Sequence, residues 1–506
     1  MPSTLTKARH YTELPPCLAH DLRHRFHFAS TAKMVFHMSN PSSAQSNIAS
    51  EQQLSSAFDL ILKHMPDSAI SAFSLRLSPA TVYTTLTTLL ILTLQRLSGG
   101  CSLETVVREA LANHSQLFPD NKRVRDGTLS ENPSGFSRAR LKLSVETTEK
   151  FCDIISESLI RPYHGDLQES KTYVIDGTTL ALAPTDELAK VYPPARNQYG
   201  QSVWPVMQLT VAHELISGVA LRPEFGAMYG ADNTSEAEQI ENLIKRLPIN
   251  SILLADSGYG IFRVVYRCVL AKHNVIFRLS NSRFKAMVRS ARLVDTVDGI
   301  QKYELLWKPS VKDLKHNPEL PGDAQVLVNI YSKTGNNHQG KEEALHVVSQ
   351  MNLEPAEVMA AYAQRYNRIE NDIRDLKVTL NLEQIRAQSD EMVRKEILCG
   401  MAAYNTVVQL RRLAAAKAGV EPKRISFRRS LDTTRSFLLA FGRTNLEEWT
   451  NRFQQAINLV SKDLIPIRPG RSFPRKAHPK RPKSTKMKQQ KPAVTDTPPP
   501  DLPHSG

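Results

Sequence analysis

The sequence predicts an α/β protein, with a mixed five-stranded sheet at its centre and helical regions before and after it. Between residues 171 and 280 apolar and polar residues alternate, and Val, Ile and Thr are frequent, which is typical of β-strands. On either side, apolar residues recur with a spacing near 3.6, which is typical of amphipathic helices. Hydrophobic residues make up 41% and charged residues 23% of the 506 residues, so a sizeable core is expected.

The N-terminal third is expected to be helical after a disordered start. Residues 1–50 are polar without sustained periodicity, and residues 51–165 predict a helical domain. The run "TVYTTLTTLLILTLQRL" from Thr81 is apolar but ends at Arg96. Since a membrane span needs ~20 apolar residues, this run predicts a buried helix. Turn-rich segments between the helices carry Lys122, Arg123, Arg125, Arg138, Arg140 and Lys142.

Residues 166–280 are expected to form the first part of a catalytic core. "TYVIDGTTLALA", "VWPVMQLTVAHE" and "GVALRPEFGAM" predict three successive strands. "SEAEQIENLIKRL" predicts a helix capped at Thr234 or Ser235. "SILLADS", "FRVVYRCVLAKH" and "NVIFRLS" predict a strand, a helix and a strand. Three strands followed twice by a helix and a strand is the ribonuclease-H-like order.

The remaining chain is divided by the same patterns. Residues 281–352 contain short strand-like pieces and predict a β-rich insertion. Residues 353–435 are helical and are expected to complete the core, and residues 436–465 contain a further helix. Residues 466–506 are rich in Pro and Lys and predict a disordered basic tail.

The charge and the cysteines restrict the class of protein. The formal net charge is +15, and ten Lys or Arg fall between Arg468 and Lys491 without an acidic residue. This surplus favours a polyanionic partner, and a solvated, nonspecific arm is the alternative. The five cysteines are scattered, with no CxxC pair. This pattern argues against a disulfide framework and a zinc knuckle, and it favours a reducing, cytoplasmic compartment. No membrane partner is expected.

Two aspartates follow predicted strands directly. Asp176 ends the apolar run "YVI", and Asp256 ends "ILLA". With this strand order the first and fourth strands lie side by side, so both carboxylates are expected at one edge of the sheet. Carboxylate oxygens suit Mg²⁺, and a third carboxylate allows a pair of ions to promote phosphoryl transfer. An Asx-turn is the alternative interpretation for each aspartate.

The third carboxylate is expected on the helix "YAQRYNRIENDIRDLK", residues 362–377. On an ideal helix Tyr366, Arg374 and Lys377 lie within about 40° of Glu370. A carboxylate, two cations and a phenol on one face suit phosphate binding beside a metal. The alternative is a solvated helix in which Glu370 and Arg374 form an i,i+4 ion pair.

These motifs resemble a known family. Asp176 in "YVIDGTT", Asp256 in "LLADSGYG" and Glu370 in "RIENDIRDLK" resemble the acidic triad of the DDE transposases, and most specifically of the insertion-sequence-4 family. The separations of 80 and 114 residues fit, because an all-β domain interrupts that family's core before the glutamate. The resemblance covers roughly residues 130–435 and implies two Mg²⁺ ions held by the triad, with Mn²⁺ as a substitute.

The family's Tyr-x2-Arg-x3-Glu-x6-Lys signature is matched with one change. The corresponding residues are Tyr362, Arg365, Glu370 and Lys377. One extra residue separates Arg365 from Glu370, which turns the arginine about 140° away on a straight helix. Either the helix is expected to start after Arg365, or a bulge restores the alignment. Tyr366 and Arg374 are then expected to take part in phosphate binding.

The resemblance implies a cut-and-paste transposase that acts through hairpin ends. Its partners are double-stranded DNA, both terminal inverted repeats and target DNA, and a second copy of the chain as a homodimer on DNA. Arg138, Arg140 and Lys142 fall where this family recognises its inverted repeats. Among the tryptophans, Trp307 is the preferred candidate for holding a flipped base. The implied location is the cytoplasm, in association with the nucleoid.

Two other functions remain open from the sequence. One is a catalytically inactive or repurposed transposase that still binds DNA, and the other is a ribonuclease-H-like nuclease that cuts DNA without joining it. The intact acidic trio favours catalysis. The changed spacing between Arg365 and Glu370 favours the protein that only binds.

Overall fold

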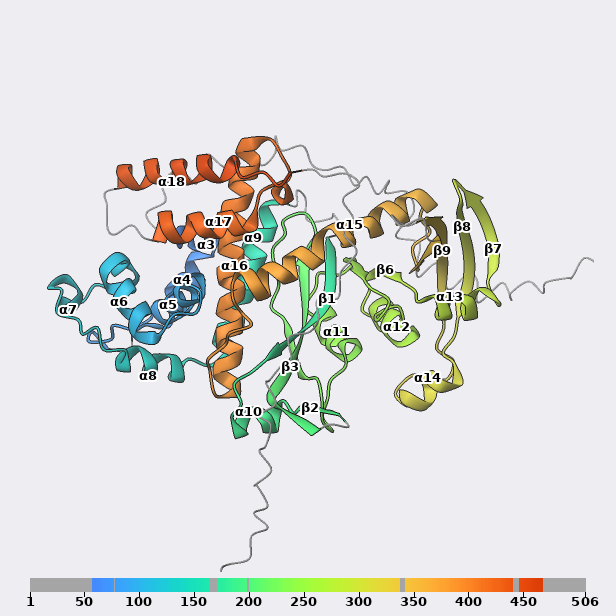
Figure 1. Ribbon diagram of the computed structural model, residues 1–506, viewed down its shortest axis with the longest axis horizontal. Helices are drawn as coiled ribbons and strands as arrows, with labels where there is room; N and C mark the ends of the chain where they lie inside the picture. The colour runs from blue at the N-terminus through green and yellow to red at the C-terminus, as the bar shows by residue number, and fades with distance from the viewer. Residues whose placement is uncertain are drawn as a thin grey trace, which may run out of the picture.

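The computed structural model describes residues 57–76, 78–163, 171–197, 200–336, 342–439 and 446–466, and it has a helical body beside a long mixed sheet (Figure 1). The predicted disordered N-terminus, residues 1–50, and the basic tail beyond residue 466 lie outside the described residues. No helix in the described ranges is long and apolar enough to cross a membrane.

Ten strands of the described chain form one sheet, in the order β2-β3-β1-β5-β6-β10-β9-β8-β7, with β4 paired to β3. The strands of its first half are β1 (Thr172–Ala181), β2 (Pro194–Asn197), β3 (Gly200–Glu214), β4 (Glu224–Ala227), β5 (Ile252–Ala255) and β6 (Asn274–Arg278). β1 runs antiparallel to β3 and parallel to β5, which is parallel to β6. The predicted pairing of the first and fourth core strands, β1 and β5, is confirmed.

The predicted third strand is shorter than its alternating pattern indicated. Only Glu224–Ala227, β4, form a strand, although the pattern ran from Gly218 to Met228. Gly218 has a positive φ of 72° in a turn, and Pro223 lacks an amide hydrogen with which to join a ladder. The chain therefore becomes a regular strand only after Pro223.

The second half of the sheet comes from the predicted β-rich segment. Its strands are β7 (Arg292–Val297), β8 (Ile300–Trp307), β9 (Val326–Asn336) and β10 (Glu342–Ser349), and the helices α13 (Asn281–Val288) and α14 (Val311–His316) lie between them in sequence. β10 pairs with β6 through Val347↔Arg278 and Val348↔Phe277. The strands of this segment therefore extend the core sheet at the side farthest from the helical body (Figure 1).

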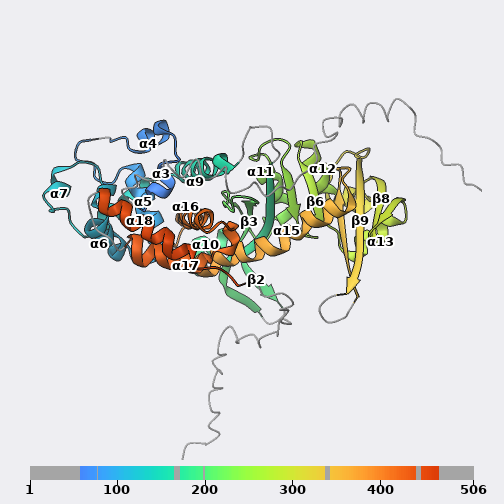
Figure 2. The same cartoon turned by 90° about the horizontal axis from the view of Figure 1, so that it is seen from above.

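Helices cover both faces of the core strands. On one face lie α11 (Glu236–Ile244) and α12 (Phe262–Leu270), and on the other lies α15 (Pro355–Arg374) (Figure 2). α11 begins with a capping box between Ser235 and Glu238. Of the two predicted N-cap residues, Thr234 and Ser235, the structure therefore uses Ser235. Tyr173 and Leu253 are buried with α11 and α12, whereas Val174 and Leu254 are buried with α15.

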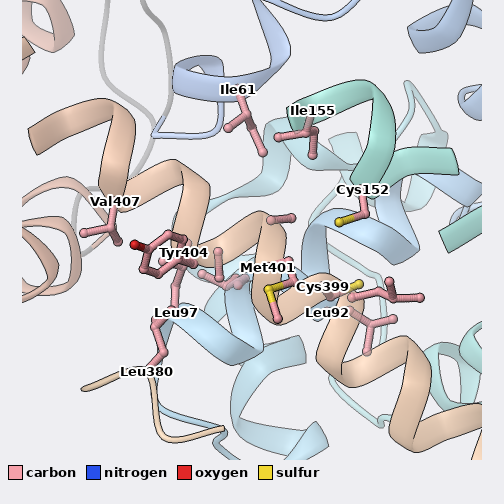
Figure 3. Close-up of a cluster of buried hydrophobic side chains, with 14 of the residues drawn as sticks. Ile61, Leu92, Leu97, Cys152, Ile155, Leu380, Cys399, Met401, Tyr404 and Val407 are labelled. Carbon is pink, nitrogen blue, oxygen red and sulfur yellow. The ribbon is translucent and has the colours of Figure 1, made fainter. Parts of the chain in front are cut away.

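The helical body joins both ends of the described chain. Its elements are α3 (Asp59–Leu62), α4 (Asp67–Phe73), α5 (Thr85–Leu97), α6 (Leu103–Asn113), η3 (Ser115–Leu117), α7 (Lys122–Arg125), α8 (Ser134–Lys142), α9 (Val145–Ile160), η4 (Arg161–Tyr163), α16 (Asp390–Ala418), η6 (Pro422–Arg424), α17 (Phe427–Thr433), η7 (Thr434–Leu439) and α18 (Leu446–Ser461). Side chains of α3, α5, α9 and α16 meet in its core (Figure 3). The 29-residue α16 is buried over most of its length.

The segment that carries the basic residues 122–142 differs from the prediction. It was expected to be rich in turns, and it contains the short helices α7 and α8. Phe136 is fully buried in α8, and its ring lies 5.9 Å from that of Tyr83. A single buried aromatic residue anchors this helix, so the sequence shows no repeating apolar pattern there.

Asn405 joins α16 to the irregular chain after β3, and its replacement is expected to destabilise the protein. Its buried amide donates to the carbonyl oxygen of Ala220 and accepts from the amide of Ala220, both at 2.9 Å. Asn405→Ala leaves two buried backbone groups unpaired, so we expect a loss of about 2–4 kcal/mol in the free energy of unfolding. Urea denaturation measures this loss.

The exposed Asn242 on α11 provides the control for this prediction. Asn242→Ala is expected to change the free energy of unfolding by less than about 0.5 kcal/mol. Equal losses in the two variants would contradict the role given to Asn405.

Candidate active site

Strand register brings Asp176 and Asp256 together. β1 and β5 pair in parallel from Thr172↔Ile252 to Val174↔Leu254, and the same offset of 80 residues relates Asp176 to Asp256. Both aspartates come two residues after the last pair. Because side chains two apart point to the same face and adjacent strands lie about 5 Å apart, the two carboxylates lie at neighbouring positions. This face is the one covered by α15.

Each aspartate accepts a hydrogen bond from a glycine that follows it. Asp256 comes directly after β5, whereas Asp176 lies within β1, so the strand-end position expected for Asp176 is wrong. The Gly177 amide donates to Asp176 Oδ1 at 3.0 Å, and the Gly258 amide donates to Asp256 Oδ1 at 2.8 Å. The second contact is the Asx-type bond that was considered as the alternative role for Asp256. It uses one carboxylate oxygen, so the turn contact is compatible with a role for Asp256 as a ligand.

Arg365 reaches the site from α15. Its Nη2 lies 3.3 Å from Asp176 Oδ2, and the whole residue is 7% exposed. α15 is continuous from Pro355 to Arg374, so the expectation that the helix starts after Arg365 is wrong, and no bulge separates Arg365 from Glu370. Tyr362, three residues earlier, packs in the core beneath the sheet. This packing directs the same helix face, and therefore Arg365, towards Asp176.

The other residues predicted on this helix have different surroundings. Tyr362 is fully buried and Arg374 is exposed. Lys377 lies in a π-helical turn, η5 (Asp375–Thr379), and its Nζ is 3.4 Å from Glu383 Oε1. The backbone of Glu370 and Tyr366 belongs to α15, and their side chains lie outside the described residues.

A carboxylate that sequence reasoning missed, that of Glu236, lies beside the two aspartates. A Cβ added to Gly177 would be 2.1 Å from Glu236 Oε1. A Cβ added to Gly258 would be 3.1 Å from Asp256 Oδ1 and 3.9 Å from Glu236 Oε2. Gly177 therefore leaves room for this carboxylate beside Asp176, whereas a side chain at position 258 would meet it only at an ordinary contact distance.

Glu236 was missed because an acidic residue in the first turn of a helix ordinarily interacts with the helix dipole. The available signal was the glycine directly after Asp176. A position without a side chain beside a functional residue often marks the close approach of another group.

Burial and mutual repulsion shape the electrostatics of this cluster. Burial raises the pKa of Asp176 to about 6; Arg365 lowers it, and Asp256 and Glu236 raise it further. Burial, and then the charge of Asp256, raises the pKa of Glu236. Three carboxylates and one guanidinium thus leave a surplus of negative charge.

The donor chemistry fits a hard divalent cation. Mg²⁺ prefers carboxylate oxygens and retains several water ligands, and Asp176 and Asp256 present carboxylates at neighbouring positions. Within the described ranges, no three His, Cys, Asp or Glu residues are arranged to hold a metal ion. The described residues therefore supply a pair of carboxylates, and the third ligand expected from the sequence, Glu370, has its side chain outside them.

The basic residues of α8 differ in exposure. Arg138 and Lys142 are exposed and lie four residues apart on one side of the helix. The Arg140 side chain is 18% exposed, and its Nη1 lies 3.7 Å from Oε1 of the buried Glu396. Arg138 and Lys142 therefore offer free surface charge, whereas part of the Arg140 charge is balanced internally.

The tryptophans also differ in exposure. Trp307, the preferred candidate for base contact, is 8% exposed, and its ring packs edge-on against Phe262 at 5.5 Å. Trp449 is 3% exposed, and Trp204 on β3 is 49% exposed. Of the three, Trp204 has the ring surface on which a base can stack.

Comparison with known protein families identifies the central part of the chain. Residues 168–406 match the family model of the transposase DDE domain. No curated protein has significant sequence similarity to the chain. The matched segment includes both aspartates, Glu236, Arg365 and Glu370, and it supports a DDE transposase.

The Arg365–Asp176 pair predicts a pH-dependent loss of stability on mutation. Arg365→Gln removes the cation that offsets Asp176, so the pKa of Asp176 rises further above about 6. A raised carboxyl pKa opposes folding once the group is ionised, so the loss grows as pH rises through that value. In EDTA we expect Arg365→Gln to lower the free energy of unfolding by about 2–4 kcal/mol at pH 8 and by roughly half of that or less at pH 5. Urea denaturation at the two pH values measures this loss.

The control repeats Arg365→Gln in an Asp176→Asn background. Without the carboxyl group, the loss is expected to be the same at both pH values. A pH-independent loss in the single variant would contradict the assigned pairing.

Proposed function

We propose that the chain is a DDE transposase of the insertion-sequence-4 type, encoded by an insertion sequence. It binds the terminal inverted repeats as a homodimer, cuts the DNA through hairpin ends and joins the freed end to target DNA. One observation carries this proposal. Paired residues of β1 and β5 differ by 80 in sequence number, and Asp176 and Asp256 differ by the same 80. This pair lies inside the segment that matches the transposase DDE domain.

The proposed ligands of the metal are Asp176, Asp256 and Glu370, which together would hold two Mg²⁺ ions or Mn²⁺ in their place. Bound ions would supply charge neutralisation and activation of the attacking oxygen in phosphoryl transfer. The amides of Gly177 and Gly258 orient the two aspartates by direct hydrogen bonds. Arg365 on α15 balances part of the charge of Asp176.

The fold supports this proposal. The order β4-β3-β1-β5-β6, with β1 and β5 parallel, has the strand neighbours of a ribonuclease-H-like core. The strands from Arg292 to Ser349 then fall between the second aspartate and the α15 helix of Glu370, as a β-rich insertion would.

The proposed DNA surface combines several positions. Arg138 and Lys142 are exposed on α8, and Arg374 is exposed at the end of α15. Arg140, Arg365, Tyr366 and Lys377 complete the proposed set. Tyr362, which was expected to contact DNA, is fully buried and is therefore left out of this surface. A protein with these contacts would be associated with the nucleoid in the cytoplasm. Trp204, with its exposed ring, is the tryptophan best suited to hold a flipped base.

A second candidate function is a transposase-derived protein that binds DNA without cutting it. One observation favours this function. α15 is continuous across positions 365 and 370, which lie about 140° apart around a regular helix. A nuclease that cuts without joining is the remaining alternative.

The first test is Asp256→Asn, assayed on a labelled duplex that carries the end of the element encoding this chain. We expect cleavage to fall at least about 100-fold, because a carboxylate ligand is lost, while duplex binding is retained. Gel analysis of nicked, hairpin and joined products measures each step. Cleavage at near the wild-type rate would overturn the assignment of Asp256.

The exposed Asp323→Asn is the matched control and is expected to cut normally. The wild-type products separate the three functions. Joined products support the transposase, nicked products without joining support the nuclease, and binding without any nick supports the inactive protein.

Glu236 gives an independent test of the carboxylate cluster. Removing an outer carboxylate beside ligands typically weakens metal affinity by about 10–100-fold, so Glu236→Gln is expected to weaken Mn²⁺ binding by about tenfold in calorimetry. Glu238→Gln removes a charge from the same helical turn while its amide can keep the capping box, and it should bind Mn²⁺ normally. Equal affinities in both variants would exclude Glu236 from the cluster.

A further inference from the structure

A groove of about 410 Å³ opens between the helical body and the segment after β1. We call it the α10–α16 groove, after α10 (Asp186–Val191) and the first turn of α16. Its polar lining consists of Arg140, Thr185, Glu187, Arg386, Gln388 and Ser389. The groove thus combines side chains from α8, from the start of α10 and from the segment that leads into α16.

The groove has a surplus of positive charge. The Glu396 carboxylate lies behind it, 3% exposed, and contacts both Arg96 at 3.4 Å and Arg140 at 3.7 Å. Arg386 is exposed and forms no hydrogen bond or ion pair with other residues of the described chain. Glu187 also lines the groove, and its carboxylate accepts from the Asp390 amide at 3.2 Å and keeps its negative charge. The three guanidinium groups of Arg96, Arg140 and Arg386 therefore exceed the two carboxylates of Glu187 and Glu396 by one charge.

Neutral donors accompany the arginines. The Thr185 hydroxyl donates to the carbonyl oxygen of Gln388 at 3.0 Å, which fixes the chain before α16. Ser389 occupies the N-cap position of α16, and its side chain does not cap the helix. The Ser389 hydroxyl and the exposed Gln388 amide therefore lie beside the first turn of this helix, which carries Asp390 and Glu391. Guanidinium, amide and hydroxyl donors in one groove suit a phosphodiester.

The groove is close enough to the candidate active site to contact the same duplex. Thr185 follows Asp176 by nine residues, so the two lie at most about 30 Å apart. One helical turn of duplex DNA spans about 34–36 Å. A duplex held at Asp176 can therefore reach the groove within a single turn.

We propose that the α10–α16 groove binds the sugar–phosphate backbone of duplex DNA within one helical turn of the cut phosphodiester. Arg386 and Arg140 pair with phosphate oxygens, and Ser389 and Gln388 donate to the same strand. These contacts are independent of base sequence and hold the duplex in register with the carboxylates. This inference rests on the proposed function in that the ligand is the DNA to be cut.

The test measures how salt affects the binding of Arg386→Gln to two duplexes, one with the element's end and one unrelated. A lost phosphate contact weakens binding equally on every sequence and reduces the slope of log Kd against log salt concentration by about 1. We expect Kd to rise by about 3–10-fold on both duplexes in fluorescence anisotropy. Arg386→Lys, which keeps the charge, should restore most of the slope.

Arg108→Gln is the matched control, because Arg108 is exposed and its charge is balanced by Glu104 at 3.3 Å and Glu131 at 3.0 Å. Its slope should equal that of the wild type. Neutral methylphosphonate linkages placed within one turn of the cut provide a second measurement. At particular positions these linkages should weaken duplex binding by the wild type. At the same positions they should cause no further loss of binding by Arg386→Gln.

The possible outcomes test the groove assignment separately from the proposed transposase function. If the wild type binds and cuts the duplex while Arg386→Gln keeps the wild-type slope, the groove assignment is overturned and the transposase proposal stands. If the wild type binds no duplex at all, both are overturned. A reduced slope on both duplexes, with an unchanged thermal melt by circular dichroism, supports the groove.

Discussion

The parallel pairing of β1 with β5 is the constraint on which the candidate site depends. Its register fixes which residues of the two strands are neighbours, and Asp176 and Asp256 share that register. A slip by one residue would send one carboxylate to the opposite face of the sheet. The packing of α11 and α12 on one face and α15 on the other opposes such a slip, since it buries alternate residues of both strands.

The site concentrates negative charge at partly buried positions, which costs free energy unless the charge is balanced. Arg365 supplies part of that balance from α15, and the glycine amides supply hydrogen bonds. Glu236 adds a further carboxylate instead of relieving the others. An arrangement that stability alone would not favour is typical of a functional site.

Most of the core could be predicted from periodicity, because strands buried on both faces and amphipathic helices leave strong patterns. The β1–β5 pairing followed from strand order alone. Two features were hidden because they depend on contacts between distant segments. The contact between Arg365 and Asp176 is set by how α15 packs against the sheet. The place of Glu236 is set by the space above Gly177.

The same reasoning explains the errors in the helical region and at the third strand. α8 is anchored by the single buried ring of Phe136, which is too little for a periodic signal. The alternating pattern from Gly218 continued through Pro223, where the backbone cannot join a ladder.

One hydrophobic cluster in the helical body includes Ile61 of α3, Cys152 of α9, Leu180 of β1 and Val460 of α18. α16 lies inside this cluster, with residues on all its sides buried. The segments before the catalytic strands are therefore not a detachable module. Evolution can retune such a protein for a new DNA sequence by changing its surface, but exchanging its N-terminal helices for those of a relative would require the interior to be rebuilt at the same time.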